Sequence, residues 1–110
     1  MTAFAIQSLT DGASRLIVDG DMSIYNALEV KEQLINAVRN TNTLELDLSH
    51  VGEMDTAGFQ LLVLAKKECE RLEKTLKITA HSDPVRELID FYNMGAFFGD
   101  PVVILAQNKE

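Results

Sequence analysis

The chain has 110 residues, of which 46% are hydrophobic and 25% are charged, and its formal net charge at pH 7 is -7. This length and composition are typical of one globular domain, here residues 1–110, with a single modest core. The excess of 17 acids over 10 bases disfavours direct binding to nucleic acids and to anionic membrane surfaces, because both carry negative phosphate groups.

Targeting and redox signals are sparse. Residues 1–4 lack the basic region and apolar stretch of a signal peptide, and the longest apolar run, 61–65, is too short to span a bilayer. One cysteine, Cys69, excludes an internal disulfide and fits a reducing compartment. We therefore expect a cytoplasmic protein with no membrane insertion, a description that also fits a peripheral partner of a membrane complex.

The chain begins with two strand-like segments, residues 4–9 and 14–18. Between them stands Asp11-Gly12, and an Asp-Gly pair between two such runs is typical of a β-hairpin. The first two strands are therefore predicted to be antiparallel.

A helix is predicted after the break at residues 20–23, with Ser23 as its N-cap and residues 40–43 at its end. Apolar residues recur from here at helical spacing, with Lys31 as the one gap in the stripe. The predicted buried stripe consists of Ile24, Ala27, Leu28, Leu34, Ile35 and Val38.

The next pair of elements is a strand at 43–48, where leucine alternates with polar residues, and a helix at about 56–72. The helix carries more apolar surface than one contact face requires. Its predicted buried stripe is Gly58, Leu62, Ala65, Cys69 and Leu72, and the further apolar residues are Phe59, Leu61, Val63 and Leu64.

Residues 75–80 form a further predicted strand, and a third helix begins with Asp83 as N-cap and Pro84 at the first helical position. Its buried stripe is Val85, Leu88, Ile89 and Tyr92. A last strand is predicted at 101–105. The order is thus β-β-α-β-α-β-α-β, an α/β fold in which the strands after the hairpin pair in parallel through right-handed crossovers.

One segment, residues 46–58, carries the most specific pattern. It places Asp47-Leu48-Ser49 at the end of a strand, a short turn, and then Asp55-Thr56-Ala57-Gly58 at the start of an apolar helix. This arrangement resembles the STAS domain family, which includes the bacterial anti-sigma factor antagonists. A short glycine-containing turn before the first helix, here residues 20–21, is also a family feature. The resemblance covers nearly the whole chain and implies a mixed sheet of four to five strands packed with three to four helices.

The resemblance also implies a function. In the switching members of the family, the residue at the position of Thr56 is phosphorylated by a partner serine/threonine kinase. The unmodified form binds an anti-sigma factor or a kinase-like regulator, the phosphorylated form releases it, and a phosphatase resets the cycle. The expected partner-contact residues are Asp21, Ser23, Asp55, Thr56, Ala57, Gly58 and Phe59. We expect a monomer or a weak dimer.

Two alternatives stay open at the level of sequence. Thr56 or Asp55 could simply cap the helix, because hydroxyl and carboxylate groups satisfy unpaired backbone N–H groups there. Many antagonists carry serine at the position of Thr56. Threonine occurs in other members, including the STAS subunit of a bacterial phospholipid-transport ATPase complex. A constitutive subunit of such a transporter or of a sensory complex is therefore the second interpretation.

Catalysis has little support in the sequence, which lacks a Walker phosphate loop and a G-x-S-x-G elbow. His50 and His81 are isolated, without a second ligand at metal-binding spacing. A phospho-aspartate receiver domain is a weaker rival. Such a domain requires an acidic pair after the first strand and a late lysine, whereas here residues 10–12 supply one acid and residues 79–81 no lysine. We expect no enzymatic activity, no cofactor and no metal.

Overall fold

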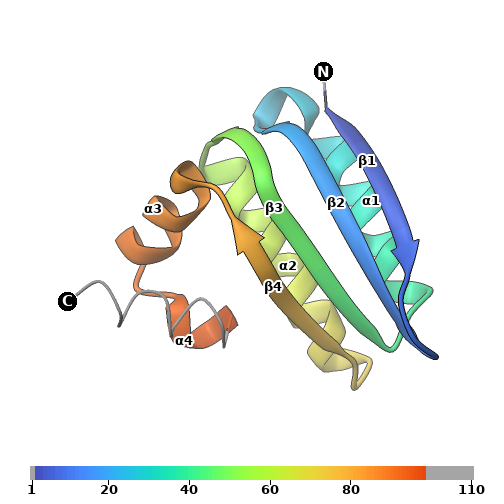
Figure 1. Ribbon diagram of the computed structural model, residues 1–110. Coiled ribbons are helices and arrows are strands. Elements are labelled where there is room, and N and C mark those ends of the chain that lie inside the picture. Colours follow the sequence, from blue (N-terminus) through green and yellow to red (C-terminus); the bar gives the residue numbers. More distant parts are fainter. Residues whose placement is uncertain (1, 99–110) are drawn as a thin grey trace.

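A computed structural model describes residues 2–98 of the chain (Figure 1). Four strands form one sheet in the order β1-β2-β3-β4. They are β1 (Ala3–Ser8), β2 (Ala13–Met22), β3 (Thr43–Met54) and β4 (Thr75–His81). β1 is antiparallel to β2, whereas β2, β3 and β4 run parallel, which confirms the predicted mixed sheet.

The hairpin between β1 and β2 follows from its turn residues. Gly12 has a φ of 77°, a left-handed conformation that glycine adopts without steric cost. The backbone N–H of Ala13 donates to the carbonyl of Thr10 at 3.0 Å, and the strands then pair from Ser8 with Ser14 onward. The Asp11-Gly12 signal is therefore confirmed.

Helices cover one face of this sheet. A short 3-10 helix, η1 (Ile24–Asn26), leads into α1 (Ala27–Arg39), and α2 (Thr56–Arg71) lies beside α1 behind the strands in Figure 1. α3 (Asp83–Phe91) and α4 (Gly95–Phe98) lie beyond the β4 edge. The core between sheet and helices includes the leucines of β3 and the buried stripe of α2, namely Leu44, Leu46, Leu48, Gly58, Leu62, Ala65 and Cys69.

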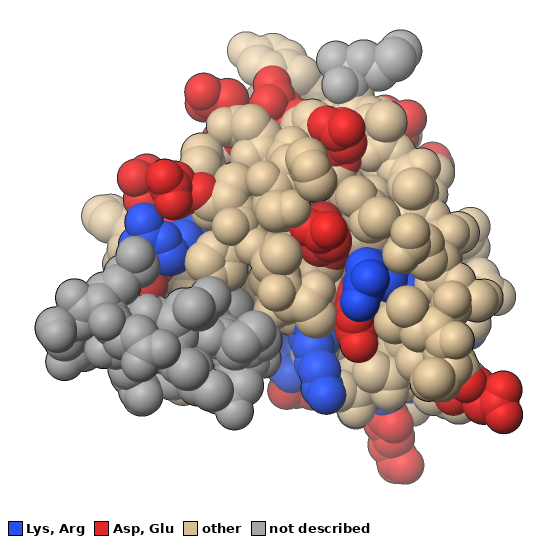
Figure 2. Space-filling model, viewed as in Figure 1, with Lys and Arg blue, Asp and Glu red and all other residues tan. Residues whose placement is uncertain are grey.

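No helix of residues 2–98 lies on the opposite face of the sheet in Figure 1. Figure 2 views this face, where uncharged residues cover most of the surface and basic side chains lie beside acidic ones. An ion pair joins Arg15 of β2 to Glu45 of β3 at 2.9 Å. Among residues 2–98 no helix has the length and apolar character required to cross a membrane.

Several predicted boundaries need correction. β2 continues through the predicted break to Met22, and β3 continues through the predicted turn to Met54, because the two strands stay paired as far as these residues. The N-cap of α3 is Ser82, so Asp83 is the first helical residue and Pro84 the second. α4 was not predicted. The predicted strand at 101–105 lies outside the described residues.

The predicted stripe of the first helix is partly wrong. Leu34 and Val38 are buried, but Val30 and Ala37 complete the buried face, while Ile24 and Leu28 are 66% and 71% exposed. The chain enters this helix through a 3-10 segment, which has about three residues per turn, so the spacing counted from Ile24 does not continue into α1. Apolar side chains are left on the surface as a result.

Candidate functional site

The predicted site residues lie at one end of the sheet. Because β2, β3 and β4 are parallel, their carboxyl ends share this end, and η1, α2 and α3 begin directly after them. Met22 pairs with Met54, and the backbone N–H of Asp55 donates to the Met22 carbonyl at 3.3 Å. The loop before η1 and the first turn of α2 are thereby held together.

Asp55 links these two segments through its side chain. One carboxylate oxygen accepts a hydrogen bond from the backbone N–H of Gly58 at 2.9 Å, and the other accepts one from Ile24 at 3.0 Å. The first bond makes Asp55, one of the two capping residues that the sequence left open, the N-cap of α2. The N–H groups of Gly58 and Ile24 stabilise the charged carboxylate and hold the pKa of Asp55 below its ordinary value.

The loop before η1 is held by its own caps. The hydroxyl of Ser23 accepts from the backbone N–H of Tyr25 at 3.2 Å, and the side chain of Asn26 accepts from the backbone N–H of Ser23 at 2.9 Å. Ser23 is therefore an N-cap, as predicted, although of the 3-10 helix. The backbone carbonyl of Asp21 accepts from Thr2 at 2.6 Å, while the Asp21 residue is exposed.

Gly58 permits the close approach of α2 to the end of β2. A Cβ atom at this position would lie 2.1 Å from the backbone oxygen of Met22, a distance that no side chain tolerates. Gly58 is buried, as the predicted stripe of this helix requires. The first turn of α2 is thus placed against backbone rather than against adaptable side chains.

Thr56 is the first residue of α2 and is exposed. Since Asp55 supplies the cap, the Thr56 hydroxyl is not required for that role. Its Oγ1 lies 3.3 Å from the hydroxyl oxygen of Tyr92, at the carboxyl end of α3, within hydrogen-bond distance. Ala57, beside it, is half-buried.

Phe59 differs from expectation. It was predicted to offer an apolar side chain to a partner, but it is only 4% exposed. The ring of Tyr92 stacks on it, with centroids 4.9 Å apart and planes inclined by 24°. Tyr92 itself is 40% exposed. Sequence reasoning assigned Tyr92 only to a buried stripe, and nothing in its spacing pointed to Thr56.

An apolar groove of about 690 Å³ begins at Thr56. It runs along α2 between the start of α1 and the end of α3, and its charged lining residue is Lys67. Elsewhere on η1, α1 and α3, the apolar side chains Ile24, Tyr25, Leu28 and Phe91 are all more than half exposed. The groove is lined by Ala27, Thr56, Ala57, Phe59, Gln60, Leu61, Val63, Leu64, Lys67, Tyr92 and Met94.

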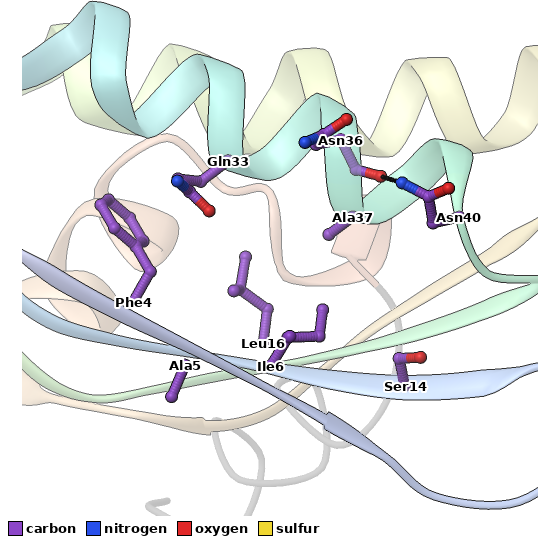
Figure 3. Close-up of a pocket in the computed structure, with 9 residues that line it drawn as sticks. All are labelled: Phe4, Ala5, Ile6, Ser14, Leu16, Gln33, Asn36, Ala37 and Asn40. Carbon is purple, nitrogen blue, oxygen red and sulfur yellow. Dashed lines mark hydrogen bonds between the residues drawn. The ribbon is translucent and has the colours of Figure 1, made fainter.

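A smaller hollow of about 260 Å³ lies at the other edge of the sheet, between β1 and α1 (Figure 3). Phe4, Ile6 and Leu16 point from the strands toward α1, whose amide side chains Gln33 and Asn36 border the space from above. None of the predicted site residues lines this hollow. The predicted site is therefore associated with the groove along α2.

The part of the chain that the structure describes, residues 2–98, contains no group of three or more His, Cys, Asp or Glu side chains placed to hold a metal ion.

Ser49, near the site in sequence, donates its hydroxyl to Asp47 at 2.5 Å. The Ser49 oxygen also lies 3.2 Å from Nδ1 of His50, and all three side chains belong to β3.

Comparison with protein families gives a match over residues 6–104 to the family described as "Mlab, STAS domain". The chain is also similar to solved structures. One is an anti-sigma factor antagonist from Mycobacterium paratuberculosis, with a TM-score of 0.77, 18% identity and coverage of 89% of this chain and 83% of that chain.

Two further structures are of the anti-sigma factor antagonist SpoIIAA. The unphosphorylated form has a TM-score of 0.70 and 18% identity, covering 86% of this chain and 84% of that one. The phosphorylated form, from Bacillus, has a TM-score of 0.68 and 17% identity, covering 86% of each chain. At these identities the likeness establishes a shared fold.

Proposed function

The chain belongs to the STAS domain family, and we propose that it is a phosphorylation-switched, protein-binding regulator of the anti-sigma factor antagonist type. In this proposal the unmodified protein binds an anti-sigma factor or a serine/threonine kinase-like regulator. Phosphorylation of Thr56 releases that partner, and a phosphatase restores the binding form. The protein then acts by binding rather than by catalysis.

The modification is a simple group transfer from ATP supplied by the kinase. The Thr56 oxygen attacks the γ-phosphorus, the bond from that phosphorus to the oxygen bridging it to the β-phosphate breaks, and ADP leaves. The hydroxyl proton passes to a base of the kinase. The phosphatase reverses the state by hydrolysis, in which water takes up the phosphoryl group and the threonine hydroxyl is regenerated.

The observation that carries this proposal is the position of Thr56. It is exposed, it is not the residue that caps α2, and it lies at the end of an apolar groove. A phosphate adds about -1.5 to -2 charge at pH 7. The partial positive charge of the α2 N-terminus tolerates this charge within the protein, whereas an apolar partner surface seated over Thr56 would have to desolvate it.

The test measures the affinity of the cognate regulator for Thr56→Glu and Thr56→Ala by calorimetric titration. We expect Thr56→Glu to weaken binding and Thr56→Ala to retain it. Thr10→Glu is the matched control, because it makes the same substitution at an exposed threonine in the β1–β2 turn, away from the groove. Incubation with the kinase and ATP should place phosphate on wild type and not on Thr56→Ala.

A second function, a constitutive subunit of a larger assembly, is favoured by a different observation. The groove is accessible without any modification, and exposed apolar surface of this kind marks sites of protein–protein interaction. In that case Thr56→Glu would change the affinity for the partner no more than the control Thr10→Glu does. That result would replace the switch with the constitutive role.

A further inference from the structure

Tyr92 connects the candidate switch residue to the groove. Its hydroxyl oxygen is 3.3 Å from Thr56 Oγ1, and its ring stacks on Phe59 at 4.9 Å. One side chain therefore contacts the hydroxyl that the proposed kinase would modify and also covers a buried residue of the groove. Thr56 and Tyr92 are 36 residues apart in the chain and belong to different helices.

The contact between the two hydroxyls leaves no room for an added group between them. At 3.3 Å the oxygens are in direct contact. A phosphoryl group replaces the small hydroxyl hydrogen with a phosphorus bearing three oxygens and a charge of about -1.5 to -2. Phosphorylated Thr56 and the present position of the Tyr92 hydroxyl are therefore incompatible on this side of the residue.

Tyr92 is placed so that its side chain can move. It is the C-cap residue of α3, and the next residue, Asn93, has a φ of 55°, so the helix ends there. The Tyr92 residue is 40% exposed, and its ring contacts that of Phe91, a residue that is 75% exposed. Phe59, in contrast, belongs to the hydrophobic core and is buried. Of the two stacked rings, the tyrosine is the one that moves at low cost.

We propose that Tyr92 senses the state of Thr56: the Tyr92 ring stays stacked on Phe59 while Thr56 carries no phosphate, and phosphorylation displaces the ring and opens that wall of the groove. The inference rests on the proposed function, because phosphorylation is the event that is sensed. It extends that function by transmitting the modification from the first turn of α2 to the end of α3. Partner release then arises from a changed surface as well as from added charge.

The structural test uses Tyr25→Phe as background. The chain has two tyrosines, so this variant leaves Tyr92 as the only one, and Tyr25 is 95% exposed, so its replacement disturbs no packing. Ring-to-ring nuclear Overhauser effects between Tyr92 and Phe59 are then measured in the hydroxyl form, in Thr56→Glu and in Thr56→Val. Thr56→Val removes the hydroxyl at nearly constant volume and adds no charge.

We expect the Tyr92–Phe59 effects to persist in Thr56→Val and to be lost in Thr56→Glu, with Thr56→Asp as a second acidic variant if Thr56→Glu does not fold. Persistence of the effects in a folded acidic variant would overturn the inference. Their loss in Thr56→Val would overturn it equally, because the stack would then depend on the hydroxyl and not on the added group.

A binding cycle separates this inference from the proposed function. Affinity for the cognate regulator is measured for wild type, Thr56→Glu, Tyr92→Ala and the double variant. If Tyr92 transmits the change, the fold-loss caused by Thr56→Glu is smaller in the Tyr92→Ala background. An equal fold-loss in both backgrounds would overturn the role of Tyr92 and leave the switch intact. No loss in either background, with the ring displaced, would instead contradict the proposed function alone.

Discussion

The carboxylate of Asp55 and the backbone N–H of Ile24 form a 3.0 Å hydrogen bond that joins the entrance of α2 to the entrance of η1. Because the other carboxylate oxygen caps α2 through Gly58, one side chain fixes both segments that surround Thr56. The geometry of the candidate site thus depends on a residue that would itself carry no phosphate.

Replacement of Asp55 should therefore affect two segments at once. Asp55→Ala loses the cap, worth about 0.5–2 kcal/mol of unfolding free energy. It also loses the bond to Ile24, worth about 0.5–1.5 kcal/mol. Asp55→Asn keeps a capping oxygen but presents an amide to one of the two donors, so we expect a smaller loss. Urea unfolding measures the stabilities, and hydrogen exchange at the Ile24 amide reports the second bond.

Thr56→Ala is the control for this series. Thr56 does not cap α2. Thr56→Ala should therefore lower the unfolding free energy less than Asp55→Ala does, and hydrogen exchange at the Ile24 amide should not change. A Thr56→Ala variant as unstable as Asp55→Ala would contradict the assignment of the cap.

The pH dependence of stability should carry the signature of the same carboxylate. Hydrogen bonds from Gly58 and Ile24 lower the pKa of Asp55 in the folded state relative to the ordinary value of 3.8. Protons therefore bind the unfolded chain more readily, and the stabilisation is fully present above that ordinary value. It is lost as pH falls through the folded pKa.

The measurement is urea unfolding of wild type and Asp55→Asn between pH 7 and pH 2. We expect the difference in stability to shrink at the acidic end, because Asp55 of the wild type becomes protonated. The pKa of Asp47 is also lowered, because hydrogen bonds from Ser49 and the charges of His50 and Arg15 together outweigh the rise caused by burial. Asp47 is present in both proteins, so its contribution cancels from their difference in stability. A constant difference across this range would exclude a contribution from the charge of Asp55.

Local patterns in the sequence predicted the fold well where neighbours in the chain decide the structure. The Asp11-Gly12 turn, the Ser23 and Asp55 caps and the buried stripe of α2 depend on residues within a few positions of one another. The ends of β2 and β3 depend instead on distant residues. The residues by which these strands exceed their predicted lengths pair with each other across the sheet, with two shifts of register. Such irregular pairing has no short-range signal.

The same limit applies to the candidate site. The motif at 55–58 pointed to Thr56 and offered Asp55 as a cap of α2, but the contact between Thr56 and Tyr92 depends on where the end of α3 packs. Helical periodicity assigned Ile24 and Leu28 to the core, whereas both are exposed. Periodicity assumes one regular helix, so it fails where the chain enters α1 through a 3-10 segment.

Cys69 should behave as a core residue. It is 1% exposed within α2, and burial raises the pKa of its thiol, so the reactive thiolate is scarce near neutral pH. We expect the native protein to react with a thiol reagent far more slowly than the chain unfolded in urea. Native labelling at the unfolded rate would show that the thiol is accessible and would contradict its place in the core.

Two glycines at the site end of the sheet offer a matched test of how α2 is positioned. In Gly58→Ala the new methyl group would lie 2.1 Å from the Met22 backbone oxygen, so the helix or the strand must shift. In Gly52→Ala the nearest atom is a side-chain oxygen of Asp21 at 3.1 Å, and that exposed side chain can rotate away. We expect Gly58→Ala to cost about 1–3 kcal/mol or more, the usual range for overpacking, and Gly52→Ala to cost clearly less.

Because the backbone of Met22 also accepts the Asp55 N–H, a shift caused by Gly58→Ala should disturb the whole entrance of α2. Amide chemical shifts of residues 22–26 and 55–59 should therefore change together in Gly58→Ala and stay near wild type in Gly52→Ala. Equal stability of the two variants, with unchanged shifts at 22–26, would mean that α2 does not rest against the end of β2.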